Sequence, residues 1–173
     1  MINVRRYSKG EEEVLRQICL DTTLVINVKE YGSELVHKWT TRLKDKSAWK
    51  EHVRKKNPFV AEIDSQLIGF AEFSTNGKIG AFYSHHHWQR KGVGTALLCR
   101  IETEAEKLGI ENILVESSLS ASKFFESKGF KVMREIEVYA DGIVSKSIEL
   151  VKSNANNKCM QSDHQTATRF VDR

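Results

Sequence analysis

Residues 89–96 read Gln89-Arg90-Lys91-Gly92-Val93-Gly94-Thr95-Ala96, and they join an apolar run to a strongly helical segment. Gly92 and Gly94 leave the backbone without side-chain cover where the helix begins. The first amides of a helix have no intrahelical partner, and the helix dipole adds partial positive charge there. Such a place suits an anion, most often a phosphate. Because Arg90 and Lys91 add two full charges, the stretch predicts a cradle for a pyrophosphate.

The composition narrows the class of protein. A chain of 173 residues suits one domain, or one domain with a tail. The net charge is +4, and Lys and Arg are spread among Asp and Glu rather than clustered as on a nucleic-acid-binding face. Cys19, Cys99 and Cys159 lie far apart and show no metal-ligand spacing. No apolar run approaches the ~18 residues that cross a membrane. We therefore expect a reduced, cytoplasmic protein without metal, nucleic acid or membrane among its partners.

Hydrophobic periodicity divides the chain into elements. Ser8, with Glu11 three residues later, forms a capping-box pattern that predicts a first helix, and the pattern breaks at 28–33. Further helices are expected at 34–43, 47–55, 93–108 and 121–128, and strands at 2–6, 59–63, 66–74, 78–84, 113–115, 130–138 and 143–151. Because helices alternate with strands only in the middle, the sheet should be mixed rather than wholly parallel. Residues 1–152 are expected to form the domain, and the polar segment 153–173 a disordered tail.

Two segments carry a resemblance to a known family. The first is Phe82-Tyr83-Ser84-His85-His86-His87-Trp88-Gln89-Arg90-Lys91-Gly92-Val93-Gly94, and the second is Ala121-Ser122-Lys123-Phe124-Phe125-Glu126-Ser127-Lys128-Gly129-Phe130. In this order, and with this strand count, they resemble the GNAT superfamily of acetyl-CoA-dependent N-acetyltransferases over roughly Ile2 to Val151. The resemblance implies an α/β (α+β) fold, with one mixed, splayed sheet of about six to seven strands flanked by helices.

The resemblance also implies where acetyl-CoA lies. The main-chain amides of residues 89–94 would hold its pyrophosphate. Its pantetheine arm would lie between two splayed strands, with a main-chain amide near Ser84 facing the thioester oxygen. The expected cofactor-binding residues are Phe82, Ser84, Gln89, Arg90, Lys91, Gly92, Val93, Gly94, Thr95, Ser120 and Phe124.

Two residues depart from the family pattern. Many relatives have a tyrosine at the position of Phe125, where it is thought to protonate the departing thiolate, and phenylalanine has no proton to donate. Tyr31 and Tyr139 are possible substitutes for that hydroxyl. An asparagine often found early in this helix region is Ser120 here, which would bond the pantetheine less rigidly.

Acetyl transfer to an amine requires a group that takes up the amine's proton. Glu72, in the apolar stretch 69–73, is the first candidate base, and its alternative is an exposed residue on a half-covered strand. Tyr83 is a candidate proton donor, with packing as its alternative. His85 is a candidate proton relay. The run of residues 85–87 suggests a metal, but consecutive residues of an extended stretch point different ways, so no metal is expected.

The leading hypothesis is an enzyme that moves an acetyl group from acetyl-CoA to a primary amine by direct attack in a ternary complex. The alternative is a non-catalytic acyl-CoA-binding sensor, which the replacement at Phe125 favours. Nucleotide binding is disfavoured because the P-loop pattern and the third glycine of the dinucleotide motif are missing. Trp39 and Trp49 either wall the acceptor pocket or belong to the core. The acceptor, a small molecule, a peptide terminus or a lysine, stays open, as does a homodimer.

Overall fold

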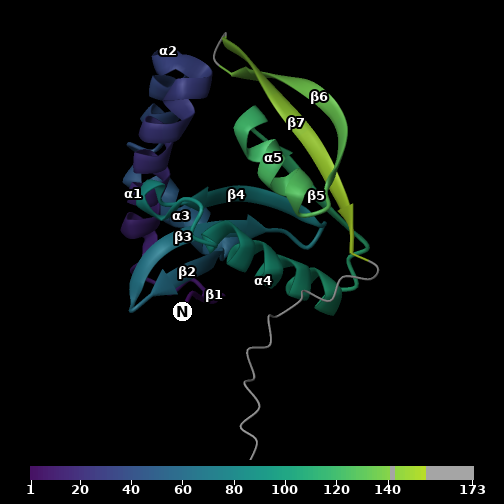
Figure 1. Cartoon of the computed structure of the whole chain (residues 1–173). Helices are drawn as coiled ribbons and strands as arrows, with labels where there is room; N and C mark the ends of the chain where they lie inside the picture. Colours follow the sequence, from purple (N-terminus) through teal and green to yellow (C-terminus); the bar gives the residue numbers. More distant parts are fainter. Residues whose placement is uncertain (141–142, 155–173) are drawn as a thin grey trace, which may run out of the picture.

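A computed structural model describes residues 1–140 and 143–154 (Figure 1). Its elements are β1 (Asn3–Arg6), α1 (Glu12–Thr22), the π-helical turn η1 (Thr23–Asn27), α2 (Val28–Arg42), α3 (Lys46–Lys56), β2 (Phe59–Ile63), β3 (Gln66–Phe73), β4 (Lys78–Ser84), the 3-10 turn η2 (His86–Trp88), α4 (Val93–Lys107), β5 (Asn112–Ser117), α5 (Leu119–Ser127), β6 (Lys131–Ala140) and β7 (Ile143–Ser153). From residue 155 on, the predicted tail lies outside the described residues, and so does the side chain of Tyr139.

The strands form one seven-stranded sheet in the order β1-β2-β3-β4-β5-β7-β6. β4 and β5 run parallel, and the other five neighbouring pairs that the structure describes are antiparallel. The recorded β4–β5 pairing consists of Lys78↔Leu114 and Ile79↔Val115, although β4 continues to Ser84. The two strands therefore separate after Ile79. The mixed, splayed sheet expected from the sequence is confirmed.

Each face of the sheet has its own core. On one face α4 packs over the sheet, and Leu97, Ile101 and Phe125 are buried among strand residues. On the other face α1 and α3 bury Leu15 and Val53 against β2 and β3. Figure 1 shows α1 and α2 on one side of the molecule and α5 with the β6–β7 hairpin on the other.

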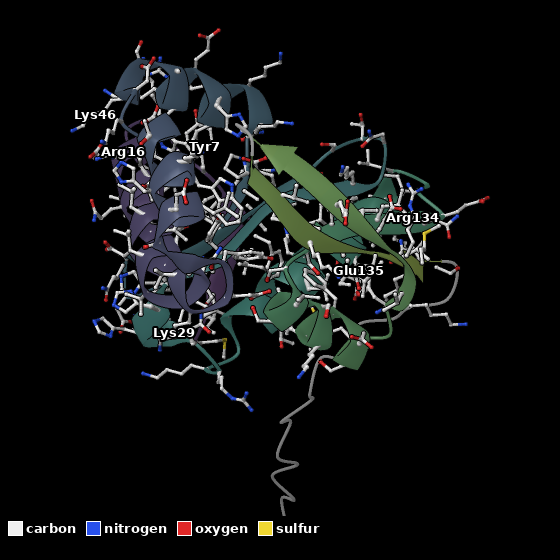
Figure 2. The ribbon with its side chains drawn as sticks, turned by 90° about the horizontal axis from the view of Figure 1, so that it is seen from above. Tyr7, Arg16, Lys29, Lys46, Arg134 and Glu135 are labelled. Atoms are coloured by element: carbon white, nitrogen blue, oxygen red, sulfur yellow. The ribbon has the colours of Figure 1, made fainter. Side chains whose placement is uncertain are left out.

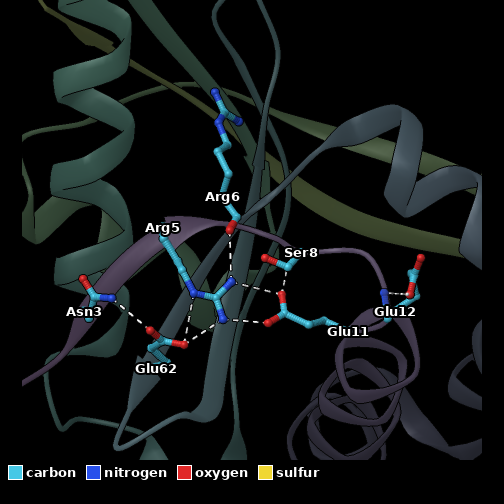
Figure 3. Close-up of polar contacts among 8 residues, drawn as sticks. Asn3, Arg5, Arg6, Ser8, Glu11, Glu12 and Glu62 are labelled. Carbon is cyan, nitrogen blue, oxygen red and sulfur yellow. Dashed lines mark hydrogen bonds and ion pairs between the residues drawn. The ribbon is translucent and has the colours of Figure 1, made fainter.

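An ion-pair network joins the first strand to the first helix (Figure 3). The Arg5 guanidinium contacts Glu11 Oε1 at 2.6 Å and Glu62 Oε2 at 2.8 Å, and its hydrogen bond lowers the pKa of Glu62. The Ser8 amide donates to Glu11 Oε2 at 2.7 Å, which is one half of the expected capping box. The expected role of Ser8 as the N-cap is wrong, because the helix begins at Glu12 with Glu11 as its cap. The pair with Arg5 holds Glu11 there.

The helical region after α1 is more continuous than the sequence suggests. The π-helical turn η1 leads from α1 directly into α2, where a break was expected at 28–33. That break is confined to Gly32, whose φ of 78° and ψ of 166° kink α2 without ending it. π-helical turns occur frequently at functional sites. Viewed from above, Lys29, Arg16 and Lys46 lie on this helical side of the molecule (Figure 2).

The β6–β7 hairpin lies on the side of the molecule away from α1, and Figure 2 shows Arg134 and Glu135 on this side. Arg134 Nε contacts Glu149 Oε2 at 2.6 Å, and Lys146 Nζ contacts Glu135 Oε1 at 2.6 Å, so ion pairs link the two strands. Among the described residues, the helices are too short or too polar to cross a bilayer.

Candidate active site

The loop before α4 has the backbone of an anion-binding turn. Gly92 is the N-cap residue at φ 87°, and Arg90 also has a left-handed φ of 58°. Within the described part of the chain, no side chain caps the first amides of α4. A Cβ on Gly92 would meet a single neighbouring atom, Ile2 Cδ1 at 3.8 Å. The amides therefore face open space, and this geometry is compatible with the phosphate site that the sequence predicts.

Two glycines let the start of α4 lie close to the sheet. A Cβ on Gly94 would come within 3.1 Å of Phe124 Cζ and 3.5 Å of Phe82 Cε1. A Cβ on Gly69 would lie 2.8 Å from Val93 Cγ1 and 2.7 Å from a carbonyl oxygen of β4. The role of Gly69 was not predicted, because it depends on a helix that follows much later in the chain.

The other predicted residues of the loop differ in exposure. Val93 is buried, so its amide and not its side chain is available to a ligand. Lys91 is exposed, and its Nζ lies 5.0 Å from the centre of the Trp88 ring. Arg90 and Gln89 are exposed, whereas Thr95 in the first turn of α4 is half-buried. The residues present fit a diphosphate held by main-chain amides with cationic side chains beside it.

The seam between β4 and β5 presents main-chain groups of β4. The amide of His85 donates to the Ile68 carbonyl of β3 at 2.9 Å. Because amide directions alternate along a strand, the main-chain groups of Ser84 and Phe82 point away from β3, into the space that β5 has left. The Ser84 carbonyl accepts from Thr22 Oγ1 at 3.3 Å, a contact that the sequence did not indicate. These positions fit the expected pantetheine arm.

The first turn of α2 reaches the far side of the seam. Ser120 donates to the Glu30 carboxylate through its amide and through its hydroxyl. The neighbouring Tyr31 hydroxyl donates to the Lys146 carbonyl at 3.4 Å, and burial together with Glu30 raises the pKa of Tyr31 to about 12. Ser120 therefore lies at the start of α5, as expected, but in contact with a carboxylate from α2. Sequence reasoning missed Glu30, which is 90 positions away.

Phe125 is part of the core. Its side chain is 2% exposed, and its ring centre lies 5.3 Å from Phe82, 5.2 Å from Phe124 and 5.3 Å from Phe130. The aromatic cluster lies on the α4 face of the sheet, beside Gly94. A hydroxyl is therefore replaced by apolar packing at the position where many relatives have tyrosine.

Glu72 is buried, and the strands around it are shaped to accommodate its carboxylate. The β3–β4 register shifts between Ala71 and Phe73, and a Cβ on Gly80 would lie 2.7 Å from Glu72 Oε2. Glu72 Oε1 lies 2.6 Å from His52 Nε2 of α3, and Oε2 lies 3.5 Å from the Ala81 amide. The exposed alternative for Glu72 is therefore wrong, since the carboxylate is enclosed between α3 and β4.

Tyr83 is directed toward α1. Its ring stacks on Phe70 at 5.5 Å, and its hydroxyl interacts with Cys19 and Thr23. Burial raises the pKa of Tyr83, and the neighbouring Cys19 raises it further. A phenol that is held in this way and has a raised pKa is a poorer proton donor, so the geometry favours the packing alternative.

The three histidines do not form the extended stretch that was expected, because residues 86–88 form the 3-10 turn η2. Their rings gather with centres 4.0 to 5.4 Å apart. Within residues 1–140 and 143–154, no group of three His, Cys, Asp or Glu side chains is placed to hold a metal ion.

His85 follows Ser84 directly and is placed to exchange protons. Its Nε2 lies 4.0 Å from Asp21 Oδ2, and its Nδ1 accepts from the His87 amide at 3.3 Å. Burial lowers the pKa of His85, the nearby His86 and His87 lower it further, and Asp21 opposes them. The imidazole is therefore neutral at pH 7 and able to accept a proton. It also lines a groove of about 450 Å³ between α1 and the β2–β3 turn.

The splayed mixed sheet and the uncapped glycine turn at the start of α4 are the features that the resemblance to the GNAT superfamily led us to expect. The chain matches the acetyltransferase (GNAT) domain family over residues 27–151. It is 28% identical over 142 residues to the uncharacterized N-acetyltransferase YafP of Escherichia coli (strain K12), covering 82% of this chain and 89% of that protein. The chain therefore belongs to the GNAT acetyltransferase family.

Solved structures agree with this fold. A GCN5-related N-acetyltransferase from Rhodopseudomonas palustris superposes with a TM-score of 0.82 at 21% identity, over 87% of this chain and 94% of that one. The PaiA N-acetyltransferase of Thermoplasma acidophilum, solved in complex with coenzyme A, gives a TM-score of 0.73 at 19% identity. The superposition covers 88% of this chain and 99% of that one. The protein is thus an acetyl-CoA-dependent N-acetyltransferase, which favours the enzyme over the sensor.

Proposed function

We propose that the protein transfers the acetyl group of acetyl-CoA to a primary amine by direct attack in a ternary complex. The observation that carries the proposal is the seam between β4 and β5. Its β4 side presents the main chain of Ser84 and Phe82, and the uncapped start of α4 lies beyond its end. A ligand anchored by its diphosphate at that helix would lie along the seam with its reactive end near Ser84.

The thioester supplies an acetyl group that is already activated, so the protein needs no covalent intermediate of its own. The amides of residues 89–94 and the hydroxyl of Thr95 would hold the diphosphate, with Arg90 and Lys91 beside it. Phe124 and Ser120 would border the arm. One amide near Ser84 would stabilise the charge that develops on the carbonyl oxygen.

Carboxylates on both sides of the open end of the seam support a cationic acceptor. Asp21 lies beside His85 at the end of β4, and Glu30 contacts Ser120 at the start of α5. A primary amine arrives as an ammonium ion at neutral pH, and negative charge around the entrance attracts it. The amine would approach from the α1–α2 side, opposite the Phe82 and Phe124 rings.

Two groups are proposed to take the amine's proton. Glu72 is three residues along β3 from Gly69, which pairs with Ser84, so it lies roughly 10 Å from the reacting end and would act through water. His85 is adjacent to Ser84, and its lowered pKa leaves it neutral. Glu72 accepts the proton in the proposed reaction, and His85 relays it from the seam. Tyr83 keeps its packing role, and the departing thiolate takes a proton from solvent.

The proposal is tested with acetyl-CoA and a panel of small primary amines, peptides with free amino termini and lysine-containing peptides. Free thiol is measured as coenzyme A is released, and mass spectrometry identifies the acetylated product. We expect both signals to rise together with at least one amine, and to be unchanged by EDTA because no metal is proposed. Tight binding of acetyl-CoA without turnover of any amine would overturn the proposal and support the sensor.

Location and assembly are also proposals. We propose a cytoplasmic enzyme whose partners are its amine acceptor and, in a possible homodimer, a second copy of the chain. Light scattering measures the molar mass and decides between monomer and dimer.

A further inference from the structure

We propose that His52 is a positioning residue that orients Glu72 and returns the proton taken up by that carboxylate to solvent. The inference rests on the proposed function, because it deepens the role of Glu72 in acetyl transfer. It adds an element to the site, since α3 then supplies a side chain to the chemistry.

The first observation is the enclosure of Glu72. Its side chain is 6% exposed, and it lies where the β3–β4 register shifts. Gly80 leaves space for Oε2, because any Cβ at that position would collide with it. An acid in such a pocket has little direct contact with bulk water, so a neighbouring group that reaches solvent gives its proton an exit after each turnover.

The second observation is that His52 spans the distance from Glu72 to the surface. Its Nε2 lies 2.6 Å from Glu72 Oε1, yet its side chain is 44% exposed. Imidazole is the side chain that gains and loses protons near neutral pH, and its two nitrogens allow a proton to enter on one side and leave on the other. One ring thus contacts both the buried acid and solvent.

The third observation is that the ring is held in place. Trp49 stacks on His52 with ring centres 5.9 Å apart and planes 25° apart. The indole Nε1 of Trp49 donates to the Glu12 carbonyl at 2.6 Å, which fixes the tryptophan against α1. Asp45 caps α3 by accepting from the amides of Ser47 and Ala48. An exposed surface pair would not require this support, since exposed ion pairs contribute little to stability.

The other titratable groups near Glu72 are unsuited to the task. On α1, burial raises the pKa of Cys19 to about 11. On β4, burial raises the pKa of Tyr83. Both groups therefore stay protonated at neutral pH and cannot accept a proton from Glu72. His52, from α3, is left as the group that can accept the proton of Glu72.

The proton balance is simple. An N–H bond of the ammonium acceptor breaks, and an O–H bond forms on the Glu72 carboxylate, with water as the bridge. The carboxyl group then gives its proton to Nε2 of the neutral imidazole, and the proton on Nδ1 leaves to solvent. Glu72 is again a carboxylate, and His52 is neutral with its proton on Nε2. Exchange with water at the exposed ring then returns that proton to Nδ1, which frees Nε2 for the next turnover.

The test uses three variants in the full chain with an amine that the wild type acetylates. His52→Ala removes the ring, and His52→Gln keeps an N–H donor toward Glu72 but cannot pass a proton. His37→Gln, on the exposed side of α2, is the matched control. We expect kcat at pH 7 to fall at least about tenfold in both His52 variants, with the KM for acetyl-CoA and the activity of His37→Gln unchanged.

Rescue by added imidazole distinguishes a proton relay from a purely structural role of His52. Added imidazole should restore most of the kcat of His52→Ala and leave the wild type unchanged, with acetylated amine measured by mass spectrometry so that acetyl-imidazole is not counted. Full activity of His52→Gln, or a loss in His52→Ala that imidazole does not repair, would overturn the relay.

A second readout does not depend on turnover. Nitrogen NMR of the histidine rings should show the Nε2 resonance of His52 moving in Glu72→Gln, because the carboxylate that contacts this nitrogen is replaced by an amide. An unchanged resonance would overturn the pairing. Failure of the proposed function is recognised separately, by wild-type protein that acetylates no amine while the NMR coupling of His52 to Glu72 persists.

Discussion

The two faces of the sheet each bury a carboxylate, and the two carboxylates have different partners. On the α4 face, Glu102 and Lys152 form an ion pair at 2.6 Å in which the side chains are 7% and 13% exposed. On the α3 face, Glu72 and His52 make an equally short contact, but the exposed fractions are 6% and 44%. Lysine keeps its charge at neutral pH, whereas histidine exchanges its proton with water.

The comparison indicates that burial of a carboxylate does not by itself mark an active site. The pair on the α4 face joins α4 to β7, and neither of its side chains reaches the seam in the proposed reaction. The pair on the α3 face lies among irregular features: a register shift, a close glycine and, further along, the π-helical turn η1. Strained backbone conformations cost folding free energy and cluster at active sites. The irregular features around Glu72 therefore agree with its proposed role.

The largest expected effect is a loss of kcat when Glu72 is changed and the buried carboxylate of the other face is kept. Glu72→Gln should lower kcat at pH 7 by about 100-fold or more, because the amine's proton loses its acceptor. The loss should shrink at high pH, where more of the amine is already neutral. Steady-state kinetics from pH 7 to higher pH measures it, with Glu102→Gln as the same change on the other face. Equal losses in both variants, or a flat pH response, would remove Glu72 from the mechanism.

The next effect concerns the cradle. Changing Gly92 and Gly94 together to Ala should raise the Kd for acetyl-CoA at least about tenfold, since the added Cβ atoms strain the left-handed turn and press on Phe124. Calorimetry measures the affinity. Gly109→Ala is the control, because Gly109 also has a positive φ, 67°, but lies beyond the other end of α4. Similar weakening by both changes would place the diphosphate elsewhere.

The smallest expected effect is on the free energy of unfolding, which should differ between variants of the two buried pairs. Lys152→Ala should cost about 3 kcal/mol of unfolding free energy, because it leaves Glu102 buried without its cation. His52→Ala should cost about 1 kcal/mol or less, since water replaces a half-exposed ring beside Glu72. Urea denaturation followed by circular dichroism gives both values. A larger cost for His52→Ala would make its pair the structural one.

Much of the fold could be read from local patterns. Alternation and helical periodicity located the strands and most of the helices, and the splay of β4 and β5 followed from the resemblance. The errors arose where a distant contact decided the local structure. Glu11 became the cap of α1 because Arg5 holds it, and the run of residues 85–87 closed into the turn η2 at the end of β4.

The sequence by itself determined the glycine turn at the start of α4, because a left-handed glycine and the uncapped start of a helix depend only on residues next to one another in the chain. It also placed Glu72 in an apolar strand but left its burial open, and only the structure decided that the side chain is enclosed. Only the tertiary structure brought His52 to Glu72 from 20 positions away, Thr22 to Ser84 and Glu30 to Ser120. These contacts depend on how helices pack against a strand, and no periodicity within either segment encodes the relative position of the two.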